Sequence, residues 1–142
     1  MKLSIVVIDG LGGRIGAQIV CSLREKAQDN IEIVALGTNA TAVDRMIKAG
    51  ADRGASGENA IIVSASLGSL IIGPIGIVIP NSMMGELSPA MAEAVMKADS
   101  KRILIPLQHD HFILVGSETV PVSKLIEEAV ERALEEIRLI LE

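Results

Sequence analysis

Residues 3–16 read LSIVVIDGLGGRIG, an unbroken apolar run that ends at Asp9 and passes into a cluster of glycines. An apolar run without alternation is typical of a parallel strand that is buried on both faces of its sheet. From Ile15 to Leu23 the apolar residues recur at helical spacing, and charged residues follow on the outer side. A buried strand, a glycine turn and an amphipathic helix in this order predict the opening unit of an α/β fold.

The same alternation of strands and helices continues along the rest of the chain. Residues 51–56 have room for only a very short strand, and residues 76–80 either continue the strand before them or form a separate short segment. Further strands are predicted at 31–36, 69–73, 102–107 and 112–116. Helices are predicted around 43–47, over 58–66 and 89–98, and from 121–123 to residue 142.

The last predicted strand differs from the others in its direction. Only the polar residues 108–111 separate the runs 102–107 and 112–116, so the second run is expected to return antiparallel as a hairpin. We therefore predict a single Rossmann-like domain over residues 1–142. Its fold class is α/β, a three-layer open sheet that is mostly parallel, with a C-terminal antiparallel hairpin strand and a long C-terminal helix.

The composition excludes several classes of partner. The chain has 49% hydrophobic residues, a formal net charge of −5 and a single aromatic residue, Phe112. Nucleic acid is not an expected partner, because a phosphodiester backbone attracts basic patches and bases stack on aromatic side chains. Glycines and prolines interrupt the uncharged stretch between Glu58 and Glu86, which argues against a membrane-spanning helix there.

Cys21 is the only cysteine, and it falls on the apolar side of the first predicted helix. It is expected to pack in the core rather than to act as a nucleophile. A lone cysteine forms no internal disulfide, which fits a reducing compartment. Because the N-terminal apolar run is too short for a signal peptide, the expected location is the cytoplasm.

The glycine-rich loop at residues 9–16 is the strongest functional signal in the sequence. Glycines between a strand and a helix allow a tight turn and a close approach of backbone N–H groups to a pyrophosphate. The spacing differs from the dinucleotide-binding pattern G-x-G-x-x-G by one inserted residue. The alternative is a turn whose glycines only permit tight packing, with Asp9 as a turn former. The candidate ligand-binding residues of this loop are Asp9, Gly10, Leu11, Gly12, Gly13, Arg14 and Ile15.

Two further loops follow apolar strands and are expected at the same edge of the sheet. NAD-binding domains hold a ribose with an acid at the end of the second strand, and no acid is present there in this sequence. The small polar residues at this point either accept a 2′-phosphate or another nucleotide, or cap the next helix. The later loop either orients a ligand or is a structural turn. The candidate binding residues are Gly37, Thr38 and Asn39 in the first of these loops and Gly73, Pro74, Ile75, Gly76, Asn81 and Ser82 in the second.

Catalytic and metal-binding groups are scarce in this sequence. Glu86, which follows the later loop, is the candidate general acid or base. His109, Asp110 and His111 suggest a metal site, but alternate residues of a strand point to opposite faces and no third ligand is evident. A polar hairpin turn is the preferred interpretation, and no metal is expected. The helix entry at 54–59 is expected to face the same crevice as the other loops.

Four segments, taken in order, resemble a known family. They are IDGLGGRIG (8–16), ALGTNATA (35–42), GASGENAI (54–61) and IIGPIGIVIPNSMMGE (71–86). The resemblance is to short bacterial proteins catalogued as a domain of unknown function, and it spans residues 3–106. It implies the Rossmann-like fold class and brings no assigned activity.

Two functions of different class are open on the sequence alone. In the first, the protein binds a small phosphate-bearing ligand, NAD(P) or another nucleotide, at its glycine-rich loops. In the second, it is a non-catalytic binding or regulatory module that forms a homodimer or a larger homo-oligomer. Assembly is expected in both cases, because the long final helix carries more apolar surface than one sheet covers. The expected contact face is formed by Leu134, Ile137, Ile140 and Leu141.

Overall fold

The computed structural model describes residues 2–108 and 112–142. Within these ranges the chain forms a five-stranded sheet in the order β3-β2-β1-β4-β5, and all neighbouring strands run parallel. The order reverses between β1 and β4, so the topological switch point of the sheet lies there. The strands are β1 (Leu3–Asp9), β2 (Ile31–Gly37), β3 (Arg53–Ser56), β4 (Leu70–Pro74) and β5 (Lys101–Ile105).

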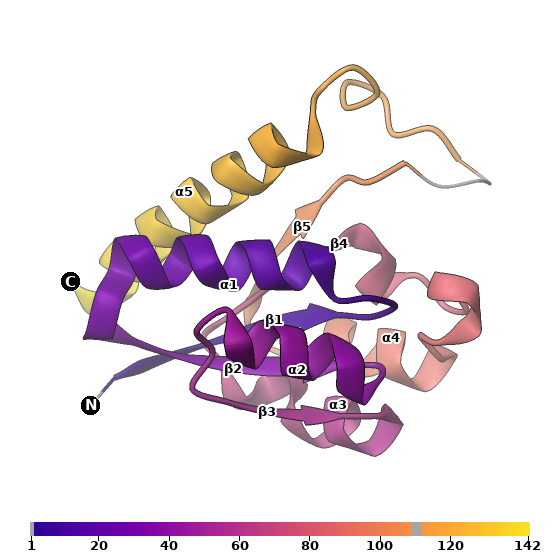
Figure 1. Ribbon diagram of the computed structural model, residues 1–142, viewed down its shortest axis with the longest axis horizontal. Helices are drawn as coiled ribbons and strands as arrows, with labels where there is room; N and C mark the ends of the chain where they lie inside the picture. Colours follow the sequence, from indigo (N-terminus) through magenta and orange to yellow (C-terminus); the bar gives the residue numbers. More distant parts are fainter. Residues whose placement is uncertain (1, 109–111) are drawn as a thin grey trace.

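Helices cover both faces of the sheet and complete a three-layer α/β fold (Figure 1). One core joins α1, α2 and α5 to one face, and a second core joins α3 and α4 to the opposite face. The α-helices of the described ranges are α1 (Arg14–Ala27), α2 (Ala40–Lys48), α3 (Glu58–Ser64), α4 (Pro89–Lys97) and α5 (Val122–Leu141). None of them combines the length and the apolar character that crossing a membrane requires. The predicted Rossmann-like class with a mostly parallel sheet is confirmed.

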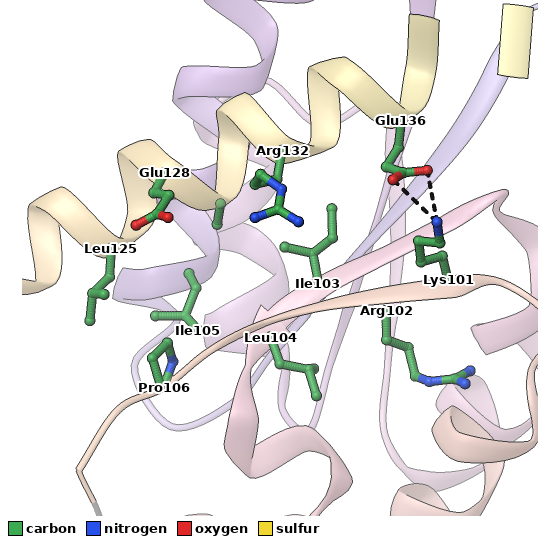
Figure 2. A pocket seen from close by; sticks show the side chains of 11 residues that line it. Lys101, Arg102, Ile103, Leu104, Ile105, Pro106, Leu125, Glu128, Arg132 and Glu136 are labelled. Atoms are coloured by element: carbon green, nitrogen blue, oxygen red, sulfur yellow. Dashed lines mark hydrogen bonds and ion pairs between the residues drawn. The ribbon is translucent and has the colours of Figure 1, made fainter. Parts of the chain in front are cut away.

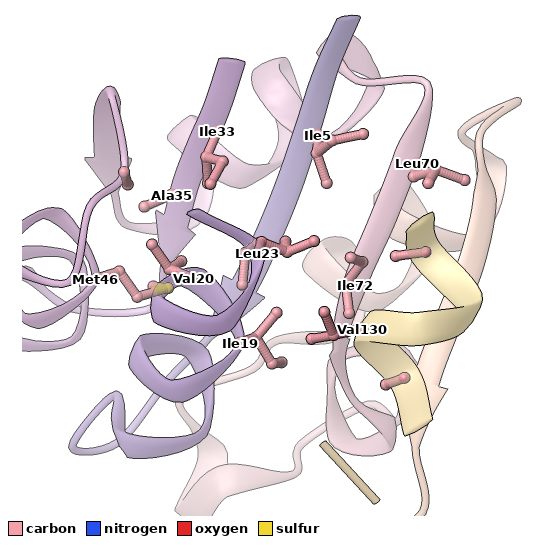
Figure 3. Packing of buried hydrophobic residues seen from close by; sticks show 14 of the residues in the cluster. Ile5, Ile19, Val20, Leu23, Ile33, Ala35, Met46, Leu70, Ile72 and Val130 are labelled. Atoms are coloured by element: carbon pink, nitrogen blue, oxygen red, sulfur yellow. The ribbon is translucent and has the colours of Figure 1, made fainter. Parts of the chain in front are cut away.

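Strand β1 is apolar on both faces because it lies in the middle of the sheet. Ile5 and Val7 face the core under α1, α2 and α5, whereas Val6 and Ile8 face the core under α3 and α4. Figure 3 shows the first core, in which Leu23 of α1 points toward the sheet. All five of these side chains are fully buried, so the strand that carries the glycine-rich loop is fixed from both sides.

Side-chain caps set the starts of the helices that follow two of the loops. The Asn39 side chain accepts a hydrogen bond of 2.8 Å from the Ala42 N–H and caps α2. Ser88 caps α4 in the same way, with Pro89 as the first helical residue, as the Ser-Pro pair predicts. The loops before these helices therefore end at defined points on the carboxyl edge of the sheet.

The antiparallel hairpin strand predicted at 112–116 is wrong. Within this run only Phe112 makes a bridge, and a turn with a hydrogen bond from Ser117 N–H to Leu114 O follows it. The apolar run suggested burial in a sheet, but Val115 is 94% exposed. Pro106 directly follows β5 and has no N–H to continue the ladder. The polar turn and the rejected metal site at His109, Asp110 and His111 lie outside the described residues.

Two short segments that the sequence left open are now assigned. The very short strand expected within 51–56 is present as β3, at the edge of the sheet. Residues 76–80 do not continue β4, because a 3₁₀ helix, Ile75–Val78, follows that strand directly. The 3₁₀ turn places Ile77 fully buried in the core under α4, which a straight continuation of the strand would not do.

Two predictions about helical side chains are also wrong. Cys21 is exposed, because the buried stripe of α1 runs through Ile19, Val20 and Leu23. Ile137, predicted on a face for a second copy, is only 5% exposed and belongs to the chain's own core. The exposed apolar side chains near the end of α5 are Leu139, Ile140 and Leu141.

Candidate functional site

A cavity of about 640 Å³ opens at the carboxyl ends of β1 and β4, where the strand order reverses. Crevices at such switch points are the usual ligand sites of open α/β sheets. The glycine-rich loop forms one wall, the turn after β4 forms another, and the segments before and at the start of α5 close the third side. The lining residues are Asp9, Gly10, Leu11, Gly12, Gly13, Arg14, Ile15, Gln18, Pro74, Ile75, Gly76, Ser82, Met83, Leu107, Gln108, Val122 and Ser123.

The Asp9 carboxylate holds the two ends of the glycine-rich loop together by hydrogen bonds. Its Oδ1 accepts a hydrogen bond of 2.8 Å from the Gly10 N–H, and its Oδ2 accepts one of 2.7 Å from the Gly16 N–H. Burial raises the pKa of this carboxyl, although the backbone hydrogen bonds oppose the rise. The carboxylate thus ties the end of β1 to the first turn of α1, which fits the role of a turn former.

Most glycines of the loop are explained by packing within the chain. A Cβ atom at Gly10 would lie 2.6 Å from the Met83 Sδ, and one at Gly13 would lie 2.6 Å from the Cα of Ala42. At Gly12, in contrast, the nearest atom would be an Arg45 guanidinium nitrogen 4.0 Å away. The packing explanation therefore holds for Gly10 and Gly13, whereas Gly12 faces open space beside the cavity.

Two backbone N–H groups at the N-terminus of α1 are available as hydrogen-bond donors. Within the described part of the chain, neither the Gly12 N–H nor the Arg14 N–H donates a hydrogen bond. Both lie at the N-terminal end of a helix, where the helix dipole favours negative charge. The Arg14 side chain is exposed and is the basic side chain among the described lining residues. In the part of the chain that the structure describes, one side of the cavity therefore carries two N–H groups without an acceptor and one positive charge.

Glu86 joins the loops after β1 and β2 from outside the cavity. Its Oε1 accepts hydrogen bonds from the Leu11 N–H at 3.0 Å, the Thr38 hydroxyl at 2.5 Å and the Asn39 Nδ2 at 2.8 Å. The hydrogen bond from Thr38, with those from Asn39 and Leu11, lowers the pKa of the Glu86 carboxyl. A carboxylate held ionised in this way is a poor proton donor at neutral pH, so these contacts favour a structural role.

The segment that carries Glu86 is a strap over the glycine-rich loop, formed by residues 81–86. Three of its non-glycine residues have positive φ, namely Asn81 at 64°, Met83 at 57° and Met84 at 57°. Such backbone is uncommon outside glycine and costs free energy, so surrounding contacts must hold it. The Ser82 hydroxyl supplies one of these contacts by donating to the Gly76 carbonyl at 2.6 Å.

The structure gathers only some of the predicted site residues. The whole run from Asp9 to Ile15, the turn from Pro74 to Gly76, and Ser82 line the cavity. Gly37, Thr38, Asn39, Gly73, Asn81 and Glu86 lie outside its lining, as does the helix entry at 54–59. The entry lies two strands away from the switch point, because β3 is at the edge of the sheet.

Sequence reasoning missed several lining residues. Gln18 lies one helical turn after Arg14, and that spacing was the signal that it shares the same face of α1. Leu107, Gln108, Val122 and Ser123 come from segments that no local motif connects to the glycine-rich loop. Only the packing of α5 against the sheet brings them to the cavity.

A second hollow, of about 350 Å³, lies between β5 and α5 (Figure 2). Its walls carry Lys101 and Glu136, which form an ion pair of 3.1 Å, together with Arg132 and Glu128. The hollow is at the edge strand of the sheet and receives none of the predicted site residues. The crevice at the switch point is therefore the candidate functional site.

Comparisons with known proteins support the fold and identify the family. The chain is similar to a dodecameric FMN-dependent UbiX-like decarboxylase from Escherichia coli O157:H7, with 19% sequence identity and a TM-score of 0.51. The similarity covers 96% of this chain and 94% of the other. No curated protein matches. Because residues 4–138 match the model described as Domain of unknown function (DUF3842), the chain belongs to that family.

Proposed function

We propose that the cavity at the switch point binds a nucleotide through its terminal phosphate. The observation that carries this proposal is the set of free donors at Gly12 and Arg14, which opens onto a cavity of about 640 Å³. Ligand cavities of about 300–1,000 Å³ hold molecules of nucleotide size. A phosphate at the N-terminus of α1 would gain hydrogen bonds from two backbone N–H groups and from the Arg14 guanidinium.

The remaining walls suit the flat ring of a nucleotide. Ile15, Ile75, Met83, Leu107 and Val122 supply apolar surface from three different parts of the chain. Gln18, Gln108 and Ser123 supply polar groups that would orient the ring by its heteroatoms. Apolar walls with a few placed polar groups are the usual composition of cofactor sites.

FMN is the first candidate among nucleotides. A solved structure with the same fold is of an FMN-dependent enzyme, which supports flavin mononucleotide as the ligand. NAD(P) has less support, because Thr38 and Asn39 at the end of β2 are bonded to Glu86 rather than open to a ribose. A binding function is proposed without a reaction, since Asp9 is the acid in the described lining and no basic side chain except Arg14 accompanies it.

Replacing Arg14 with alanine is expected to weaken FMN binding by about tenfold, which corresponds to about 1.4 kcal/mol. This loss of binding free energy is at the lower end of the range for a hydrogen bond to a charged group, because the Arg14 side chain is exposed to water. Quenching of flavin fluorescence on titration with the purified protein measures both dissociation constants.

Arg138→Ala is the matched control for Arg14→Ala, because Arg138 is an exposed arginine near the far end of α5. It should leave the dissociation constant for FMN unchanged. Equal weakening by both substitutions would show a general charge effect and no phosphate contact at Arg14. If the unmodified protein binds no flavin, no NAD(P) and no other nucleotide, the proposed function is wrong.

We also propose, as a second candidate, a homo-oligomer that buries the end of α5. Leu139 and Leu141 are 64% and 58% exposed there, and a solved structure with the same fold is dodecameric. Changing both leucines to glutamate should produce monomers, as measured by light scattering during size-exclusion chromatography. Met96→Glu on α4 is the control, since Met96 is 51% exposed elsewhere. A monomeric unmodified protein would contradict this proposal.

A further inference from the structure

Three hydrogen-bond donors from two loops converge on one oxygen of Glu86. The Leu11 N–H comes from the loop after β1, and the Thr38 hydroxyl and Asn39 amide come from the loop after β2. A backbone N–H, a hydroxyl and an amide that point to one position form the kind of donor set that binds a phosphate oxygen. The chain's own carboxylate occupies this position.

The position of the Glu86 carboxylate corresponds to the place where the adenosine half of a dinucleotide would bind. In dinucleotide-binding sheets the phosphates lie over the first glycine loop, and the adenosine ribose lies at the end of the second strand. Here the strap covers that path. A Cβ at Gly10 would meet Thr38 Oγ1 at 2.5 Å and Met83 Sδ at 2.6 Å, so these two side chains fill the space directly over the Gly10 Cα.

The strap is built to hold Glu86 in this place. Positive φ at Asn81, Met83 and Met84 turns the chain across the glycine-rich loop, although none of these residues is glycine. Met84 is 96% exposed, so its conformation is not held by burial of its side chain. Backbone hydrogen bonds within the strap hold its turns, and the Glu86 and Ser82 side chains join it to the neighbouring loops.

We propose that Glu86 determines the size of the ligand, by filling the ribose position at the end of β2 so that one nucleotide binds and a dinucleotide does not. This inference rests on the proposed function. FMN and FAD are the matched probes, because FAD contains the whole of FMN and adds an adenosine monophosphate unit.

The test compares the dissociation constants of FMN and FAD for the unmodified protein and for Glu86→Ala. We expect the unmodified protein to prefer FMN by at least about tenfold, since FAD must displace a carboxylate held by three donors. In Glu86→Ala the three donors lose their acceptor, and the preference for FMN over FAD should fall by about tenfold. The readout is the ratio of the two constants, so a general change in the cavity does not produce the same result.

Two variants accompany this measurement. Glu86→Gln keeps the shape and one accepting oxygen but removes the charge, so the preference should fall by about threefold and the fold should be retained if Glu86→Ala is unstable. Glu93→Ala removes an exposed acid of α4 that pairs with Lys97, and it should leave the preference unchanged. Binding of both flavins with a ratio that neither Glu86 variant shifts would overturn the inference and leave the proposed function standing. Binding of neither flavin by any variant would overturn both.

Discussion

Replacing Gly13 with alanine is expected to lower the free energy of unfolding by about 3 kcal/mol, as judged from the usual cost of left-handed backbone and of overpacking. Gly13 has a φ of +74°, a conformation that L side chains rarely adopt. A Cβ there would also lie 2.6 Å from the Cα and 2.9 Å from the carbonyl oxygen of Ala42. Because these are backbone atoms of α2, the clash moves the helix and not a flexible side chain.

Urea unfolding at neutral pH measures this loss, with Gly116→Ala as the control. Gly116 also has positive φ, at +94°, but a Cβ there would have no atom within 4 Å. The control isolates the backbone strain, for which about 1 kcal/mol is expected. Equal losses in the two variants would show that the close approach of the glycine-rich loop to α2 contributes nothing to stability.

Replacing Asp9 with alanine is expected to lower the free energy of unfolding by about 2 kcal/mol, because a buried N–H without a partner costs about 1–3 kcal/mol. The substitution leaves the N–H groups of Gly10 and Gly16 without their acceptor. Removing a desolvated charge offsets part of that loss. Asp44→Ala is the control, since Asp44 pairs with Lys48 on the surface of α2. An effect of Asp9→Ala as small as that of Asp44→Ala would contradict the assigned role.

The difference between the Asp9→Ala variant and the unmodified protein should depend on pH in a defined direction. Burial raises the pKa of Asp9 above the ordinary value of 3.8, so the folded protein binds this proton more tightly than the unfolded chain. The resulting stability is complete below 3.8 and is lost as the pH rises through the raised folded pKa. The variant's deficit should therefore be largest in acid and smaller at neutral pH. A deficit that grows with pH would mean that the pKa of Asp9 is lowered.

Much of the fold was predictable, because each buried strand can be recognised from the apolar character of its own residues. The run at residues 3–8 is apolar at every position, and a strand in the middle of a parallel sheet requires that pattern. The run at 112–116 has the same character but forms no strand. Local pattern reports which residues are apolar and β-prone, whereas the choice of a strand partner depends on distant parts of the chain. The exposed Cys21 shows the same limit, since the buried stripe of α1 is narrower than its apolar sequence suggests.

The candidate site was predictable only along single loops. The run from Asp9 to Ile15 was found because a strand, glycines and a helix follow one another in sequence. The role of Glu86 was not found, because its three donors come from residues 47 to 75 positions away in the chain. A sequence pattern marks where a loop leaves the sheet, but it does not say which distant side chain crosses that loop.

The pairing of β1 with both β2 and β4 has a consequence for how the chain folds during synthesis. The unit β1–α1–β2 is local, whereas Ile5 of β1 pairs with Leu70 of β4, far along the chain. Contacts between residues so far apart in sequence form late, because the entropy cost of closing a long loop comes before the contacts contribute any stabilisation. A nascent chain that has reached only α2 therefore has the glycine-rich loop but lacks the opposite wall of the cavity. In the proposed function, a ligand would therefore stabilise the completed sheet and not the partly folded chain.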